Sequence, residues 1–90
     1  MVTAFYDMRP ITPVHLLVVP NRHLDSLNDM QAEDEIILGH MVKIAQVLAN
    51  NHGLHKRGYR MVINTGSDAG QSVFHLHLHL IGGRPMPFKM

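Results

Sequence analysis

The pattern of apolar and polar positions predicts four strands and one long helix in this 90-residue chain. Apolar and aromatic residues fill a first segment, 2–8, and an apolar, β-branched run at 15–19 follows a proline-containing break. Two further segments, 59–65 and 73–81, alternate residue types with the period of two that is typical of strands. A turn-forming loop at 66–70 separates them and predicts a hairpin-like pair.

A helix is predicted over about residues 31–51, between the second and third strands. Asn28 or Asp29 is predicted to cap its start, and Gly53 to end it. Gly39 lowers the helix propensity by roughly 1 kcal/mol relative to alanine, and a close helix approach in a dimer would explain it. Spacings of three and four form an apolar stripe: Ile37, Met41, Ile44 and Leu48, broadened by Ile36, Ala45 and Val47.

These elements predict one domain over residues 1–90, of the α+β class. Its core would be an antiparallel sheet of about four to five strands with one main helix packed on it. Hydrophobic residues make up 46% of the chain, which is enough for a core in a small domain. We expect the sheet to extend across the two-fold axis of a homodimer, because a second copy enlarges a small core.

Composition excludes several classes of function. Eight Lys and Arg residues nearly balance seven Asp and Glu residues without a basic run, so we expect no duplex nucleic acid partner. The apolar runs are too short to span a membrane and no signal peptide is visible, so we expect no membrane partner and a cytoplasmic location. The absence of cysteine removes disulfides, thiolate zinc sites and thiol catalysis.

Eight histidines are the compositional anomaly, and three of them alternate with leucines in the segment 75–80. Strand periodicity would place the imidazoles of His75, His77 and His79 on one face and the leucines in the core. Three uses are open: a zinc site, nucleophilic or acid–base chemistry at phosphorus, and a solvated sheet face. No carboxylate follows Asp68 to support ligand histidines, so we expect no metal and no cofactor.

The residues before the histidine row favour chemistry at phosphorus. Gly66 and Gly70 allow backbone amides to approach an anion, and Ser72 adds a hydroxyl donor. Gln71 lies on the same loop, and Asn64 can donate a side-chain amide from the end of the preceding strand. Neutral donors beside imidazoles, with no lysine, suit one modestly charged phosphate ester or amide.

The segment 64–84 resembles the signature of the histidine triad (HIT) superfamily, His-φ-His-φ-His-φ-φ with φ apolar. Gly-Gln-Ser-Val before the row and Gly-Gly-Arg after it are similar to the Hint branch, as are residues 13–20 with His23. The similarity runs from Phe5 to Arg84. It implies a hydrolase that cleaves the P–N bond of purine nucleoside 5′-phosphoramidates through a nucleotidyl-histidine intermediate. It also implies a homodimer that binds AMP- or GMP-type conjugates.

The resemblance implies a role for each matched residue. His77 would be the nucleophile, while His79 and Ser72 would contact the phosphate and the leaving group. His75 and His15 would complete the imidazole network that orients the nucleophile. The remaining matched residues would bind the nucleotide: Asn64, Gly70 and Gln71 at the phosphate, Asp7 with Met8 beside it at the ribose, and Phe5 and Leu17 at the purine.

The chain departs from the Hint pattern before Val2, where typical members carry a segment that lines the purine pocket. The base-binding half is therefore expected to be incomplete, and Phe5 and Leu17 fit a core role as well as a base contact. Two other functions are open: a nucleotide-binding interaction module with little turnover, and a dinucleoside polyphosphate hydrolase of the same superfamily. In the C-terminal tail, Met86 or Phe88 is expected to reach the partner subunit's site.

Overall fold

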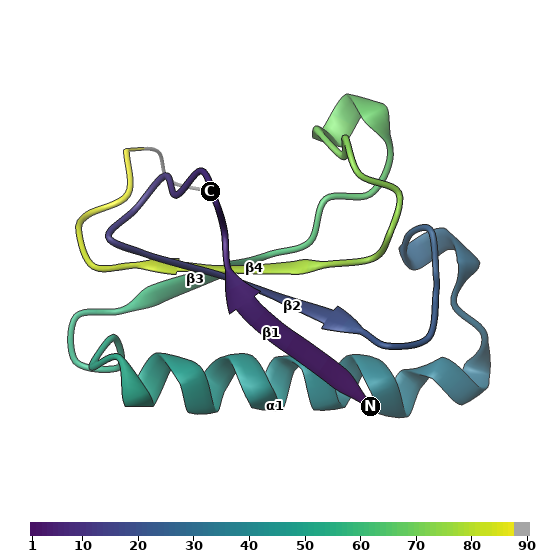
Figure 1. Cartoon of the computed structure of the whole chain (residues 1–90), viewed down its shortest axis with the longest axis horizontal. Helices are drawn as coiled ribbons and strands as arrows, with labels where there is room; N and C mark the ends of the chain where they lie inside the picture. The colour runs from purple at the N-terminus through teal and green to yellow at the C-terminus, as the bar shows by residue number, and fades with distance from the viewer. Residues whose placement is uncertain (88–90) are drawn as a thin grey trace.

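The computed structural model describes residues 1–87, in which four strands form one sheet of order β1-β2-β4-β3 (Figure 1). Every neighbouring pair is antiparallel, and the helix α1 (Glu35–Asn51) lies along one face of the sheet. This confirms the α+β class and the hairpin-like pairing of the last two strands. The strands are β1 (Val2–Tyr6), β2 (Val14–Pro20), β3 (Tyr59–Val62) and β4 (Leu78–Gly82), and single 3-10 turns occupy Leu27–Asp29, Ala32–Asp34 and Ser67–Ala69.

The helix ends where the sequence predicts, because Gly53 takes a φ of 72° just beyond it. Its start differs: α1 begins at Glu35, after a 3-10 turn. The predicted cap at Asn28 or Asp29 is wrong. The Asp29 carboxylate instead accepts the backbone N–H of Ser26 at 3.1 Å, and the chain is extended at Met30. A separate short turn therefore precedes the helix.

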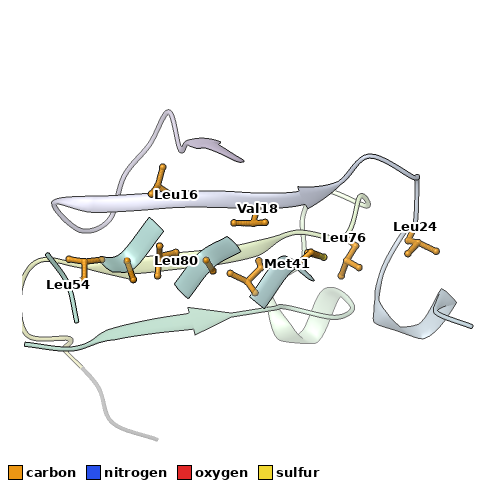
Figure 2. Packing of buried hydrophobic residues seen from close by; sticks show 10 residues of the cluster. Leu16, Val18, Leu24, Met41, Leu54, Leu76 and Leu80 are labelled. Carbon is orange, nitrogen blue, oxygen red and sulfur yellow. The ribbon is translucent and has the colours of Figure 1, made fainter. Parts of the chain in front are cut away.

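The core lies between α1 and the sheet (Figure 2). Met41, Ala45 and Ala49 are fully buried on the helix, and they repeat every four residues along one face. Ile36 and Val47 do not belong to this face, contrary to expectation. Around the helix axis, each lies at least about 120° away from the buried residues. The sheet contributes the buried side chains of Leu16, Val18, Leu78 and Leu80. Among the described residues, no helix has the length and apolar character to cross a membrane.

The histidine segment enters the sheet later than its alternation predicts. β4 begins at Leu78, whereas residues 73–77 form no strand. The N–H of Leu76 donates to the carbonyl of Leu24 at 2.7 Å, so this segment binds the loop after β2. The outer strands are likewise shorter than predicted, ending at Tyr6 and Val62. The alternation nevertheless persists in burial, since Leu76, Leu78 and Leu80 are buried and the intervening histidines are half-buried.

Candidate active site

The ring of His77 is held by a backbone carbonyl. Its Nδ1 atom lies 2.7 Å from the carbonyl oxygen of His75. A carbonyl only accepts, so Nδ1 carries the proton and donates it. In the neutral ring, Nε2 then keeps its lone pair. This is the tautomer that a nucleophilic imidazole requires.

His77 has an imidazole neighbour in His79, whose ring centroid is 5.0 Å from its own in an edge-to-face arrangement. Strand periodicity predicted a second imidazole on its other side. The structure instead places the carbonyl of His75 against His77 and turns the His75 ring away, because these residues precede β4. The Nε2 atom of His75 donates to the Pro20 carbonyl at 3.0 Å, and its ring lies edge-to-face with His23. His75 therefore braces the segment against the end of β2.

His15 and His79 face each other from β2 and β4, with the Nε2 of His15 2.9 Å from the Nδ1 of His79. The backbone N–H of Ile11 donates to the Nδ1 of His15 at 3.2 Å. The proton of His15 is therefore on Nε2, which donates to His79. Burial, followed by the charges of His77 and His15, lowers the pKa of His79 against the raising effect of Asp7. This favours a neutral His79.

Asp7, His15 and His79 bring three possible metal-ligating atoms within 4.8 Å of one another. The sequence argument against a metal missed this carboxylate, because it comes from the opposite end of the chain. A metal on the Nε2 of His15 would require that nitrogen without its proton, and the N–H of Ile11 holds the proton there. The hydrogen-bond pattern thus fits a proton-donating pair better than a metal centre.

Asp7 lies at the imidazole cluster. One carboxylate oxygen accepts the N–H of Arg9 at 2.8 Å, and the other is 3.4 Å from the Nε2 of His15. The neighbouring Met8 is 95% exposed. At the other end of the chain, Met86 is half-buried, and Phe88 lies outside the described residues. The ribose contacts expected for Asp7 and Met8, and the tail's reach to a partner, stay predictions.

The glycine loop before the histidines is shaped by Gln71. Its side-chain amide donates to the carbonyls of Asp25 and Val73, at 2.7 and 3.1 Å, and its oxygen accepts the N–H of Gly66 at 2.9 Å. Its backbone N–H donates to the Gly66 carbonyl at 3.0 Å. Since every N–H of Gln71 is donated within the protein, its role here is to position the loop. The expectation that Gln71 lines the phosphate site stays a prediction.

The remaining residues expected at the phosphate lie on or beside the same loop. Gly66 and Gly70 take φ values of 85° and 89°, a conformation that favours glycine. Asn64 donates its side-chain amide to the carbonyl of Ala69 at 2.8 Å, closing the loop. Ser72 is exposed at its end. The loop is therefore preorganised, and its contacts with phosphate stay predictions.

An apolar hollow of about 250 Å³ opens beside the histidines. Phe5 and Leu17 are register partners on β1 and β2, and both line it. Phe5 is 46% exposed and stands outside the buried core, and its contact with a base stays a prediction. Sequence reasoning missed Val19, although it shares the face of Leu17 by the strand period, and Val73. The full lining is Phe5, Leu17, Val19, Val73, His75 and His77.

Comparison with known proteins identifies the family of this chain. A family model described as HIT domain matches residues 1–86. A purine nucleoside phosphoramidase of Escherichia coli (strain K12) is 44% identical over 86 residues, which are 96% of this chain and 72% of that protein. A HIT family hydrolase from Legionella pneumophila Philadelphia 1 has a TM-score of 0.94 at 44% identity, covering 97% of this chain and 78% of that one.

A second solved structure is equally similar in fold. It is a histidine triad protein from Clostridium difficile, with a TM-score of 0.93 at 39% identity, covering 99% of this chain and 77% of that one. The family model and these relatives match nearly the whole of the chain. The chain belongs to the HIT family and is a hydrolase of that family.

Proposed function

We propose that this chain hydrolyses the P–N bond of purine nucleoside 5′-phosphoramidates through a covalent nucleotidyl intermediate on His77. The observation that carries the proposal is the bond from the Nδ1–H of His77 to the carbonyl of His75, which leaves Nε2 as a nucleophile. The apolar hollow beside this ring has the character of a base-binding surface. The similarity to a purine nucleoside phosphoramidase supports the same substrate class.

In the first step, the Nε2 of His77 attacks the α-phosphorus and the bond from phosphorus to the amine nitrogen breaks. The amine takes one proton from solvent and leaves. The nucleotidyl-imidazole carries a positive charge, which the hydrogen bond to the His75 carbonyl stabilises. His79, whose Nδ1 accepts from His15, offers its Nε2–H to the negative charge that develops on a phosphoryl oxygen.

In the second step, water attacks the same phosphorus and the bond from phosphorus to Nε2 breaks. The nucleoside monophosphate leaves, and the proton of the water returns to solvent. The first step consumes one proton and the second releases one, so the cycle balances. His77 regains the tautomer in which it began.

The test compares wild type with His77→Ala in a fluorogenic adenosine 5′-phosphoramidate assay. We expect the variant to lose at least about 1,000-fold in turnover, because the nucleophile is gone. Mass spectrometry of the quenched reaction should show a nucleotidyl adduct on wild type alone. His55→Ala, at an exposed position of the turn after α1, is the matched control and should keep wild-type turnover.

Turnover retained by His77→Ala would reject the mechanism. Faster hydrolysis of a diadenosine polyphosphate than of the phosphoramidate would instead favour the other hydrolase branch. Tight AMP binding by a wild-type protein without turnover would favour an interaction module.

We also propose that the chain acts as a homodimer. Ile36, Gly39 and Val47 fall within about 80° of one another around α1, and all three are exposed. Two exposed apolar side chains beside a glycine suit the close approach of a second helix. A monomer mass by light scattering at micromolar concentration would contradict this.

A further inference from the structure

The turn after β4 packs closely against the loop between β1 and β2. The guanidinium of Arg84 donates to the carbonyl of Ile11 at 2.9 Å, joining residues that are 73 positions apart. Gly83 has a φ of 102°, and a Cβ there would lie 2.9 Å from the Cβ of Pro13. The two segments lie side by side at one end of the sheet (Figure 1). The contact is therefore a close fit between turn and loop.

Ile11, whose carbonyl accepts from Arg84, also contacts the buried His15. The N–H of Ile11 donates to the Nδ1 of His15, which is 4% exposed. A nitrogen that accepts this bond carries no proton, so the contact disfavours the Nδ1–H tautomer of His15. It holds the proton on Nε2.

The Nε2–H of His15 then determines the proton position on His79. It donates to the Nδ1 of His79 at 2.9 Å, so the neutral ring of His79 carries its proton on Nε2. The two hydrogen bonds form a directed series, in which Ile11 donates to His15 and His15 donates to His79. Such a sequence fixes one tautomer at each ring, and its bonds strengthen one another.

We propose that Arg84 is a positioning residue: by holding Ile11 it fixes the tautomers of His15 and His79, although it contacts neither ring. The inference rests on the proposed function for the part that His79 plays at the phosphate. The groups that face His15 are Asp7, whose carboxylate is 3.4 Å from Nε2, and His79. Without the N–H of Ile11 held in place, the Nδ1 of His15 is free to carry the proton instead of Nε2.

The experiment uses the full ¹⁵N-labelled chain with two changes at one position. Arg84→Gln shortens the side chain and removes its charge, while Arg84→Lys keeps a cationic donor. Arg57→Ala is the matched control, because Arg57 and Arg84 line the same cavity of about 530 Å³. Long-range ¹H–¹⁵N spectra of the imidazoles report the tautomers of His15 and His79 directly, without any substrate.

In Arg84→Gln we expect a mixture of tautomers at His15 and His79. The kcat for the phosphoramidate should fall roughly tenfold with KM nearly unchanged, less than the loss of a whole oxyanion donor, about 100-fold or more. Arg84→Lys should restore the wild-type tautomers and most of kcat. Arg57→Ala should match wild type in both measurements.

Wild-type tautomers in Arg84→Gln would overturn the inference, even if kcat fell, since Arg84 would then act by another route. Failure of the lysine variant to restore the tautomers, when both variants are folded, would also overturn it. Should wild type prove inactive on phosphoramidates, the spectra still decide the link from Arg84 to His15, so failure of the proposed function is distinguishable.

Discussion

The Nε2 of His15 donates to the Nδ1 of His79 across the β2–β4 pair, at 2.9 Å. The two residues are 64 positions apart, and the antiparallel register of the central strands brings them together. The bond requires an unprotonated Nδ1 on His79. Protonation of His79 would therefore break it, which links the protonation of this site to its structure.

The first prediction concerns stability and pH. Burial and the nearby imidazoles lower the pKa of His79 in the folded protein below its ordinary value of 6.5. As the pH falls through 6.5, the unfolded chain therefore takes up a proton at His79 more readily than the folded chain does. The contribution of His79 to stability is thus greatest above that pH and declines as the pH falls through it. Urea denaturation between about pH 7.5 and 5.5 measures the slope.

His79→Gln should flatten this slope, because the titrating group is removed. His55→Gln, at an exposed position of the turn after α1, should leave it as in wild type. A slope identical in wild type and His79→Gln would show that His79 does not couple protonation to folding.

The second prediction separates a base-binding role from a core role at Phe5. Because this side chain is 46% exposed and lines the hollow, Phe5→Ala should raise KM about tenfold and change stability by less than about 1 kcal/mol. Its neighbour Tyr6 alternates to the other face of β1 and bonds His52 at 2.8 Å. Tyr6→Ala should leave KM unchanged. A large stability loss with unaltered KM in Phe5→Ala would assign Phe5 to the core.

The third prediction concerns the start of α1. Asp34 is fully buried, pairs with Arg22 and accepts the N–H of Gln31 at 2.9 Å. Asp34→Ala should lower the free energy of unfolding by about 2–3 kcal/mol. The change removes the ion pair of the buried Asp34 with the half-exposed Arg22, and the hydrogen bond from Gln31 just before the helix. Denaturant titration measures this loss. The exposed pair of His23 and Asp25 supplies the control, and Asp25→Ala should cost under about 1 kcal/mol.

Features set by local chemistry could be predicted from the sequence. The end of α1 at Gly53 and the burial of Leu76, Leu78 and Leu80 need only a glycine conformation and an alternation. The start of β4 could not be predicted this way. It depends on the bond from Leu76 to Leu24, made between residues 52 positions apart.

In the candidate site, too, the residues could be predicted from the sequence but their contacts could not. The resemblance of the histidine row to a known signature identified His77, His79, His75 and His15 as a group. Their hydrogen-bond directions come from the N–H of Ile11 for His15 and His79, and from the carbonyls of His75 and Pro20 for His77 and His75. Nothing in the spacing of the histidines indicates those contacts, because they depend on the fold.

The last prediction tests the homodimer at Gly39. Within the described chain a Cβ at this position would meet no atom within 4 Å, so Gly39→Ala should stabilise an isolated chain by about 1 kcal/mol through helix propensity. In the proposed dimer the added methyl group enters the approach of two helices. We therefore expect Gly39→Ala to raise the dimer dissociation constant and shift the light-scattering mass toward the monomer at a given concentration. A variant that is more stable and as dimeric as wild type would place the interface elsewhere on the molecule.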